Sequence, residues 1–466
     1  MNEPPRPRGA AHELERYAGL FASRTRVMRS SAMRDLMAIT ERPEVISLAG
    51  GLPDTSTFDE SLFATLMAGL PTARALQYGP SEGLQGVREA IASVMAAEDM
   101  SVEPDEIIVT TGGQQAIDLV CKTLLDPGDI VIAEAPTYPG AVPTFCSYEA
   151  EVIQIEMDAD GMRIDLLEET LARLDAQQRR PKFVYTIPTF QNPAGVTMSA
   201  ERRRRLVEIA HERELIVLED NPYGMLRYEG DRLPTLRSLE VPPGSLDPGD
   251  FIIYTGTMSK ILSPGVRVGW LVAPRPVMAK LILGKQSADL CSSSLAQHFV
   301  AAYFAQADWR SYVDSLRGLY RRRRDVILDA LAEHLPRAAH WTHPHGGLFV
   351  WVTLPDFIDT TNLLARALAE NVAFVPGQAA FVDGRGRSSM RLNFSSSTDE
   401  DLREGVRRIG AIVSEQVALY DTLTGQRPAP AAAAAAPTAP APREPMADVV
   451  RLPHRGATEG RRSREA

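Results

Sequence analysis

Short apolar runs alternate with amphipathic stretches from about residue 58 to residue 308, and this alternation limits most strongly how the chain folds. Residues 106–110 and 215–218 are short and apolar, as buried strands are, whereas residues 114–125 place Ile117, Val120 and Leu124 at helical spacing. Strands that alternate with helices form parallel sheets with helices on both faces. We therefore expect an α/β domain at residues 58–308, built on a mostly parallel sheet.

The rest of the chain divides around this domain. A long amphipathic helix near residues 309–334 leads into a mixed segment, which predicts a smaller α+β domain at 309–420. We expect a flexible N-terminus at 1–23 and a separate arm at 24–57. Residues 421–466 hold a run of alanines at 431–436 among many prolines. Such a composition buries too little apolar area to offset the entropy of ordering, so we expect a disordered tail.

A pair of glycines, Gly112 and Gly113, separates the strand at 106–110 from the helix at 114–125. A helix that begins behind glycines offers free N–H groups and the positive end of its dipole to a phosphate. Many turns use glycine only for its positive φ, so the glycine pair alone is weak evidence for a phosphate site. It indicates a phosphate site that includes Gln114 when other site residues accompany it.

Polar residues follow two further predicted strands. Asp220 and Tyr223 come just after residues 215–218, and Asn192 stands in a loop after a strand near residue 183. Ligands of open α/β sheets bind at this edge. Taken singly, Asp and Asn often cap helices or turn the chain, and Asn-Pro often begins a turn.

Lys260 is conspicuous because the chain hardly uses lysine: only Lys122, Lys182, Lys260, Lys280 and Lys285 occur in a Lys+Arg total of 50. It stands in a loop of small residues, just after Thr257 and Ser259 and seven residues before Arg267. Arginine stays protonated, whereas a buried lysine loses its proton readily and forms Schiff bases. Unrelated loops would rarely supply Asn192, Asp220, Tyr223, Lys260 and Arg267 in this order, so we expect a reactive amine.

Together these motifs resemble those of fold type I, class I/II aminotransferases, which depend on pyridoxal 5'-phosphate. The resemblance runs from about residue 24 to residue 417 and includes residues 47–54, 77–83, 346–351 and 390–395. Within the class, the chain is similar to the group of 2-aminoadipate, kynurenine and related broad-specificity aminotransferases. The implied fold is a large domain with a mostly parallel sheet flanked by helices, plus a smaller α+β domain.

The resemblance also implies how the cofactor is bound. Lys260 would form the Schiff base and carry the proton, Asp220 would keep the pyridine nitrogen protonated, and Tyr223 and Asn192 would hydrogen-bond the phenolic oxygen. The Asn192 amide can also reach a substrate carboxylate. The phosphate would lie among Gly112, Gly113, Gln114, Thr257, Ser259 and Arg267. The family usually has serine where this chain has Gly113, so one hydroxyl contact is missing. Tyr138 would stack on the cofactor ring; the alternative is a core tyrosine.

Four further residues match positions that bind substrate or the second subunit. Arg391 matches the arginine that binds the α-carboxylate, and a planar guanidinium fits a carboxylate through two hydrogen bonds. An ordinary strand-edge arginine is the alternative there. Arg34 matches a contact to an acidic substrate side chain, and Gly51 would let the backbone approach the substrate. Tyr78 would reach the phosphate of the other subunit, which implies a homodimer with shared active sites. The arm at 24–57 would pack on the small domain and on the dimer interface.

The implied reaction is a ping-pong transfer of an amino group from an L-amino acid to a 2-oxo acid, with 2-oxoglutarate as the expected acceptor. The donor stays open: 2-aminoadipate or glutamate if Arg34 reaches a carboxylate, and otherwise an aromatic, branched-chain, kynurenine or phenylglycine-type amino acid. Decarboxylases, lyases and condensing enzymes share this fold. A regulatory module that binds the cofactor without catalysis is a further alternative, although little sequence precedes residue 24 to form a DNA-binding head.

Composition argues against other partners. A net charge of −10 and a pI near 5.5 disfavour nucleic acid, and the arginine runs at 202–205 and 321–324 have the pattern of solvated helix faces. No signal peptide or membrane span is expected. The cysteines lack metal-binding spacing, which indicates a reduced, cytoplasmic location. His340, His343 and His345 lack the further ligands of a zinc site, so we expect no metal.

Overall fold

The computed structural model describes residue 17 and residues 19–28, 42–242, 244–245 and 249–425. Arg34 and the predicted tail from residue 426 onward lie outside these ranges, as does most of the predicted N-terminus. The predicted boundaries between the domains therefore stay predictions at both ends of the chain.

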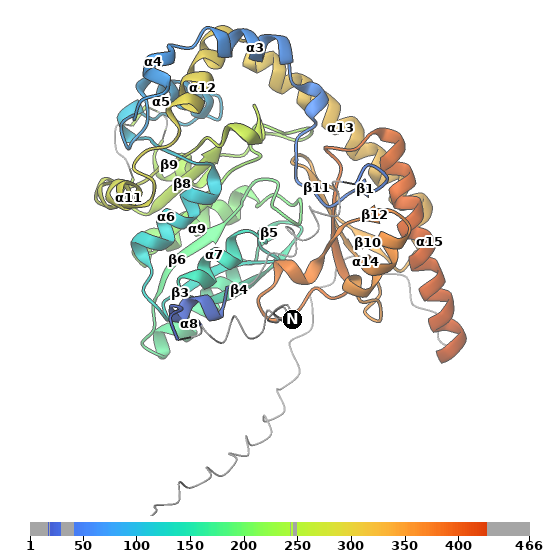
Figure 1. Cartoon of the computed structure of the whole chain (residues 1–466). Coiled ribbons are helices and arrows are strands. Elements are labelled where there is room, and N and C mark those ends of the chain that lie inside the picture. Colours follow the sequence, from blue (N-terminus) through green and yellow to red (C-terminus); the bar gives the residue numbers. More distant parts are fainter. Residues whose placement is uncertain (1–16, 18, 29–41, 243, 246–248, 426–466) are drawn as a thin grey trace, which may run out of the picture. The chain divides into compact units, whose positions relative to one another are not determined.

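An eight-stranded sheet forms the centre of the larger layer (Figure 1), with strand order β2-β9-β8-β7-β6-β3-β4-β5. The strands from β8 through β7, β6 and β3 to β4 are parallel, whereas β9 and β5 are antiparallel to their neighbours. This confirms the mostly parallel sheet. The strands are β2 (Ile108–Thr110), β3 (Ile130–Ala135), β4 (Glu151–Asp158), β5 (Gly161–Met162), β6 (Pro181–Thr186), β7 (Ile216–Asp220), β8 (Ile252–Thr257) and β9 (Gly269–Val272).

Helices cover both faces of this sheet because its buried strands are apolar on both sides. In β3, Val131 and Ala133 pack into one core, and Ile130 and Ile132 pack into the core on the opposite face. The first face carries α6 (Gly113–Leu124), α7 (Ala141–Ser147) and α11 (Arg275–Ala288). The second carries α8 (Ile164–Ala176), α9 (Ala200–Glu212) and α10 (Leu236–Glu240).

A further helical layer packs beside β2, β8 and β9. Its core joins Val109, Tyr254 and Trp270 of the sheet to apolar residues of the helices. The helices of this layer are α3 (Glu60–Ala68), α5 (Gln85–Ala96) and α12 (Ser294–Gln306), with the short α4 (Thr72–Ala75) between the first two.

A second, smaller layer contains a four-stranded antiparallel sheet of order β10-β11-β14-β13 and a parallel pair, β1 with β12. Its strands are β1 (Ile46–Ser47), β10 (His340–Trp341), β11 (Phe349–Thr353), β12 (Val372–Ala373), β13 (Val375–Pro376) and β14 (Ser389–Asn393). Its helices are α14 (Thr360–Ala369) and α15 (Asp399–Thr424). This α+β layer is the one expected from the sequence.

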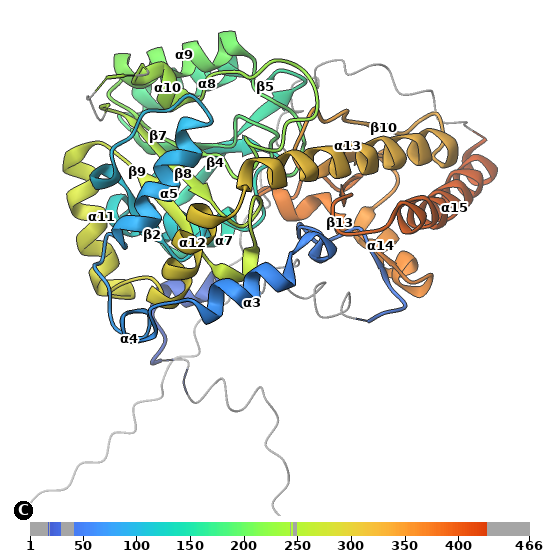
Figure 2. The ribbon, with the colours of Figure 1, turned by 90° about the horizontal axis from the view of Figure 1, so that it is seen from above.

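The helix predicted at 309–334 is α13 (Trp309–His334), and it connects the two layers (Figure 2). Trp309 and Val313 belong to the core beside the large sheet, whereas Leu316 and Tyr320 belong to the core of the small sheet. The helix is therefore shared by both layers, and residues on its middle turns lie close to both.

The prediction that the two arginine runs are solvated is wrong for three of their members. Arg203 in α9 and Arg323 and Arg324 in α13 are buried. Arg203 Nε donates to the Met198 carbonyl at 2.9 Å, and Arg324 Nη1 donates to the Pro344 carbonyl at 3.0 Å. These loop carbonyls compensate for the lost hydration of the guanidinium groups.

Helix α15 continues past residue 421, the predicted start of the tail, to Thr424 and ends at Gly425 in a left-handed conformation. Its beginning follows the usual chemistry: the Thr398 side chain accepts the Asp401 N–H, and acids occupy the first turn. None of the described helices combines the length and apolar composition needed to cross a bilayer.

Candidate active site

A cavity of about 260 Å³ opens where β6, β7 and β8 end, and the small layer and residues 49–52 close its other side. The residues that line it are Ala49, Gly50, Gly51, Leu52, Gly113, Gln114, Ile117, Tyr138, Ile187, Asn192, Asp220, Pro222, Tyr223, Thr257, Ser259, Lys260, Pro264, Arg267, Phe349, Val375 and Arg391. Most of the residues predicted for the site are among them. Parallel strands bring their carboxyl ends together, which explains why loops from different parts of the chain meet here.

Lys260 follows β8 and supplies the amine of the cavity. Its Nζ donates to the Gly51 carbonyl at 2.5 Å. Burial lowers the pKa of Lys260 to about 8, and the nearby charges of Arg391 and Arg267 act in the same direction. About one tenth of this amine is therefore neutral and nucleophilic at pH 7, several hundred times the fraction of an ordinary lysine.

Asp220 is the last residue of β7 and provides a buried carboxyl group in the same cavity. The Tyr185 hydroxyl donates to Asp220 Oδ2 at 2.7 Å. Burial raises the pKa of Asp220 to about 7, and the Glu134 carboxylate adds to this effect, while the hydrogen bond from Tyr185 opposes it. A cation placed against Asp220 would restore its negative charge.

A chain of hydrogen bonds connects the two layers across the cavity. Asn192 Nδ2 donates to the Tyr223 hydroxyl at 3.5 Å, and Arg391 Nη1 donates to Asn192 Oδ1 at 2.9 Å. Arg391 Nη2 also donates to the Ala49 carbonyl at 2.7 Å, and its guanidinium lies 4.2 Å from the centre of the Phe349 ring. Arg391 is thus held in one orientation inside the cavity.

The opposite end of the cavity is suited to an anion. Helix α6 begins at Gly113, and Gly112 before it has φ 77°, a left-handed conformation that glycine adopts easily. A side chain at Gly112 would collide with Arg267, because its Cβ would lie 2.5 Å from Arg267 Nη2. The Thr257 hydroxyl donates to Ser259 Oγ at 2.8 Å beside this position. Free N–H groups, hydroxyls and a guanidinium therefore converge on one point.

Known proteins are similar to this chain over most of its length. Residues 43–409 match the family model described as aminotransferase class I and II. The chain belongs to this family. It is 41% identical over 405 residues to aromatic-amino-acid aminotransferase 1 of Thermococcus litoralis, a match that covers 86% of this chain and 95% of the relative. It is 38% identical over 395 residues to 2-aminoadipate transaminase of Thermus thermophilus, covering 84% and 96%.

Solved aminotransferase structures have the same fold. The multiple substrate aminotransferase of Thermococcus profundus matches with a TM-score of 0.79 and 40% identity, covering 86% of this chain and 99% of that one. The α-aminoadipate aminotransferase of Thermus thermophilus, complexed with N-(5'-phosphopyridoxyl)-L-leucine, also matches with a TM-score of 0.79, at 36% identity, covering 86% and 99%. The chain is therefore a fold type I, pyridoxal-phosphate-dependent aminotransferase.

The residues of this aminotransferase fit the cofactor. The anion-binding end of the cavity matches its phosphate, the buried Asp220 carboxyl matches its pyridine nitrogen, and the Lys260 amine matches its aldehyde. Tyr138 lies beside α6, where its hydroxyl donates to Gln114 Oε1 at 3.5 Å. Gln114 Nε2 in turn donates to Thr144 Oγ1 at 2.7 Å, so the Gln114 side chain is held against α7.

Three predicted site residues are not among those that line the cavity. Gly112 lies just behind the lining residue Gly113, against Arg267. Tyr78 is 78% exposed on the surface between α4 and α5, which leaves it accessible to a second subunit. Arg34 lies outside the described residues. The role predicted for each of them stays a prediction.

Sequence reasoning missed Tyr185, Phe349 and Ala49. Tyr185 pairs with Leu218 across β6 and β7, and strand alternation places Asp220 on the same face. This alternation is a signal that could have identified Tyr185. Phe349 and Ala49 reach the cavity from another sheet and from the segment before α3, and no local pattern marks them.

Proposed function

We propose that this aminotransferase moves the amino group of an L-amino acid to 2-oxoglutarate in two half-reactions, with the first oxo product leaving before the acceptor enters. The observation that carries the proposal is the convergence of Lys260, Asp220 and Arg391 on one cavity. An amine, a buried acid and a carboxylate-binding guanidinium are the groups that amino transfer requires.

Pyridoxal phosphate, when bound, supplies an electron sink and a carrier for the amino group. We assign Asp220 to its pyridine nitrogen, and Tyr223 and Asn192 to its phenolic oxygen. The phosphate is assigned to the backbone of Gly112–Gln114 and to the side chains of Thr257, Ser259 and Arg267. Tyr138 covers the ring, and Tyr78 of a second subunit completes the phosphate site.

Lys260 moves the proton in this proposal. Once its amine is released, Nζ takes the proton from the substrate α-carbon and gives it to a carbon of the cofactor. A pKa near 8 allows Lys260 both to accept and to donate this proton near neutral pH. The Gly51 carbonyl, 2.5 Å from Nζ, accepts a hydrogen bond that orients the amine. Loss of Lys260 therefore removes both the attachment point and the base.

Arg391 binds the substrate α-carboxylate. Its contacts with Asn192 and Ala49 hold the guanidinium plane, so binding a carboxylate costs little further side-chain entropy. Asn192 contacts both Arg391, which binds the substrate, and Tyr223, which binds the cofactor. It therefore fixes the distance between the bound substrate and the bound cofactor.

The described cavity wall favours an apolar donor side chain. Apart from the residues assigned above, it offers Leu52, Phe349 and Val375. We propose an aromatic or branched-chain donor, with 2-aminoadipate or glutamate accepted when Arg34 reaches their side-chain carboxylate. Relatives named for aromatic amino acids and for 2-aminoadipate are both similar to this chain. Comparing Arg34→Ala with wild type on phenylalanine and on 2-aminoadipate tests this: only the second activity is expected to fall.

We also propose a homodimer in the cytoplasm. Exposed apolar side chains at Leu76, Tyr78, Leu290 and Leu295 supply surface for a second subunit. The three cysteines, Cys121, Cys146 and Cys291, form no disulfide, as expected in a reducing compartment. Analytical ultracentrifugation checks the dimer directly.

The experiment that tests the proposed function compares Lys260→Ala with wild type and with Lys280→Ala, an exposed lysine in α11. Wild type and Lys280→Ala are expected to show a visible cofactor band that amino donors bleach and 2-oxoglutarate restores. Lys260→Ala is expected to transfer no amino groups. Normal turnover in Lys260→Ala would refute the proposal, and carbon dioxide or ammonia as the main product would favour the other chemistries of the fold.

A further inference from the structure

Residues 48–57, here called the covering segment, are bound along their length while they close the cavity. Leu48 N–H donates to the Ala373 carbonyl at 2.8 Å. Two carbonyls that follow accept from the site itself: Ala49 from Arg391 and Gly51 from Lys260. The covering segment therefore sets the position of two acceptors that contact site residues.

An ion pair fixes the far end of this segment. Arg323 Nη2 lies 2.6 Å from Asp54 Oδ2, and both side chains are about nine-tenths buried. The Asp54 N–H donates to the Tyr320 hydroxyl at 3.1 Å, and the Ser56 N–H donates to Asp54 Oδ1 at 2.9 Å. Asp54 is thus held by both of its carboxylate oxygens and by its backbone N–H.

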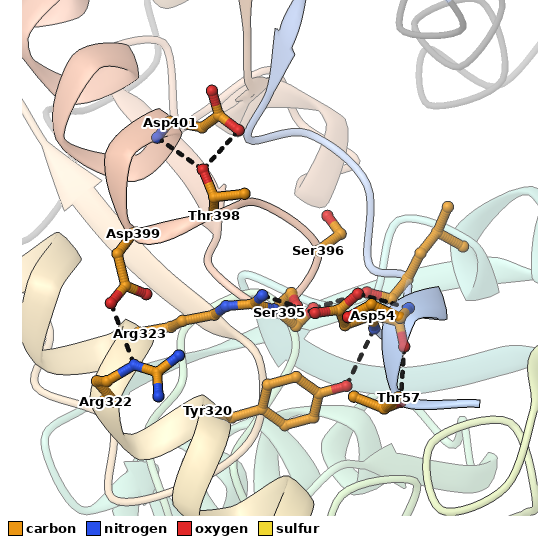
Figure 3. Close-up of polar contacts among 12 residues, drawn as sticks. Asp54, Thr57, Tyr320, Arg322, Arg323, Ser395, Ser396, Thr398, Asp399 and Asp401 are labelled. Atoms are coloured by element: carbon orange, nitrogen blue, oxygen red, sulfur yellow. Dashed lines mark hydrogen bonds and ion pairs between the residues drawn. The ribbon is translucent and has the colours of Figure 1, made fainter. Parts of the chain in front are cut away.

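Arg323 also fixes the middle of the segment through Ser395. Figure 3 shows the Arg323 side chain extending from α13 to Ser395 and Asp54 together. Its Nη1 donates to the Ser395 carbonyl, and the Ser395 hydroxyl donates to the Leu52 carbonyl at 2.7 Å. One guanidinium therefore holds both Asp54 and the residue that binds Leu52.

Burying such a pair gives little stability, because the cost of desolvating two charges offsets most of their attraction. Its value lies in fixing one geometry. The neighbouring Arg322 provides a contrast: it pairs with Asp399 at 3.1 Å on the surface, with 61% of its side chain exposed (Figure 3).

We propose that Asp54 and Arg323 are positioning residues for substrate binding in this aminotransferase. They hold residues 49–52 so that the Ala49 carbonyl keeps Arg391, which binds the substrate carboxylate, in its orientation. The proposal rests on the function proposed above for Arg391 and Lys260. Breaking the pair loosens the cavity wall and weakens binding of the substrate and of the transition state equally. The lost binding free energy therefore raises KM and leaves kcat nearly unchanged.

Steady-state kinetics of Arg323→Gln, Asp54→Asn and Arg323→Lys, with Arg322→Gln as the matched control, test this proposal. We expect KM for the amino donor to rise about tenfold in Arg323→Gln and Asp54→Asn, with kcat within about threefold of wild type. Arg323→Lys is expected to be intermediate, because lysine keeps the charge but lacks the fork that reaches two partners. Arg322→Gln is expected to match wild type.

Hydrogen exchange of the cofactor-free protein gives a readout that does not depend on activity. Amides of residues 49–57 are expected to exchange faster in Arg323→Gln and Asp54→Asn, and at the wild-type rate in Arg322→Gln. A purely structural role would lower the amount of folded enzyme, and therefore the apparent kcat per total protein, while leaving KM unchanged. That pattern, or equal effects of Arg322→Gln and Arg323→Gln, would overturn the proposal.

These outcomes separate this proposal from the proposed function. If wild type transfers amino groups and Lys260→Ala does not, but Arg323→Gln keeps the wild-type KM, only the positioning role fails. If wild type transfers no amino groups, the proposed function fails first. Should Arg323→Gln not fold, Arg323→Lys and Asp54→Asn decide by the same criterion.

Discussion

Arg391 offers the sharpest test of the site, because its surroundings leave little room for compensation. It is 1% exposed, and burial lowers its pKa to about 10 without removing its charge at neutral pH. Asn192, Ala49 and the Phe349 ring hold the guanidinium in place. We predict that Arg391→Lys keeps a positive charge but loses one of the two hydrogen bonds to the substrate carboxylate.

The size of the effect follows from that lost bond. A hydrogen bond to a charged group contributes about 1.5–3 kcal/mol, so kcat/KM for an amino acid should fall about ten- to one-hundred-fold in Arg391→Lys. Arg391→Gln removes both bonds and the charge, and should lower kcat/KM by about a thousandfold or more. Arg387→Gln is the matched control, because Arg387 lies four residues earlier and pairs with Asp359 on the surface.

The assay compares an amino acid with the corresponding amine that lacks the α-carboxylate, such as phenylalanine with 2-phenylethylamine. The loss in Arg391→Lys should appear for the amino acid and be small for the amine, so that discrimination between the two collapses. The visible cofactor band confirms in each variant that the site is intact. An equal loss on both compounds would show that Arg391 supports the fold of the site and does not bind the carboxylate.

Three further predictions follow from single groups. Because the pKa of Lys260 is lowered to about 8, the rate at which pyridoxal phosphate attaches to the cofactor-free protein should rise with pH and level off above pH 8, measured by the visible band; a rise continuing to pH 10 would contradict this. Burial raises the pKa of Glu98 from 4.5 to about 7. The protonated Glu98 therefore contributes fully to the free energy of unfolding below pH 4.5, and this contribution is lost as pH rises through 7. Glu98→Gln should flatten the decline of the free energy of unfolding between pH 5 and 8, by up to about 3 kcal/mol, in denaturant unfolding of the cofactor-free protein. Gly113→Ser should slow cofactor dissociation about tenfold, since a Cβ there meets no atom within 4 Å and the hydroxyl adds a donor for the phosphate; an unchanged rate in a dilution assay would refute it.

Much of the site was predictable because local rules place it. The carboxyl ends of β6, β7 and β8 are adjacent in the sheet, so the residues at or just beyond those ends, Asn192, Asp220 and Lys260, meet in one cavity. The helix behind Gly112 and Gly113 begins as its glycines indicate. The family resemblance added Arg391, which comes from the other sheet and which no local pattern relates to Lys260.

The errors have a common cause. The runs at 202–205 and 321–324 have the spacing of exposed helix faces, yet Arg203, Arg323 and Arg324 are buried. Helical spacing indicates which residues share a face, but it does not reveal what later covers that face. Here the covers are loops and the covering segment, which supply carbonyls and a carboxylate to the buried guanidinium groups.

The sequence alone determined the alternation of strands and helices and the chemical groups of the site, because both depend on residues within a few positions of one another. Tertiary structure decided the rest: that Arg323 meets Asp54 across 269 positions, that the Gly51 carbonyl meets Lys260, and that Tyr185 binds Asp220. A buried polar group must find its partner wherever the folded chain brings one, and that partner is set by packing and not by local pattern.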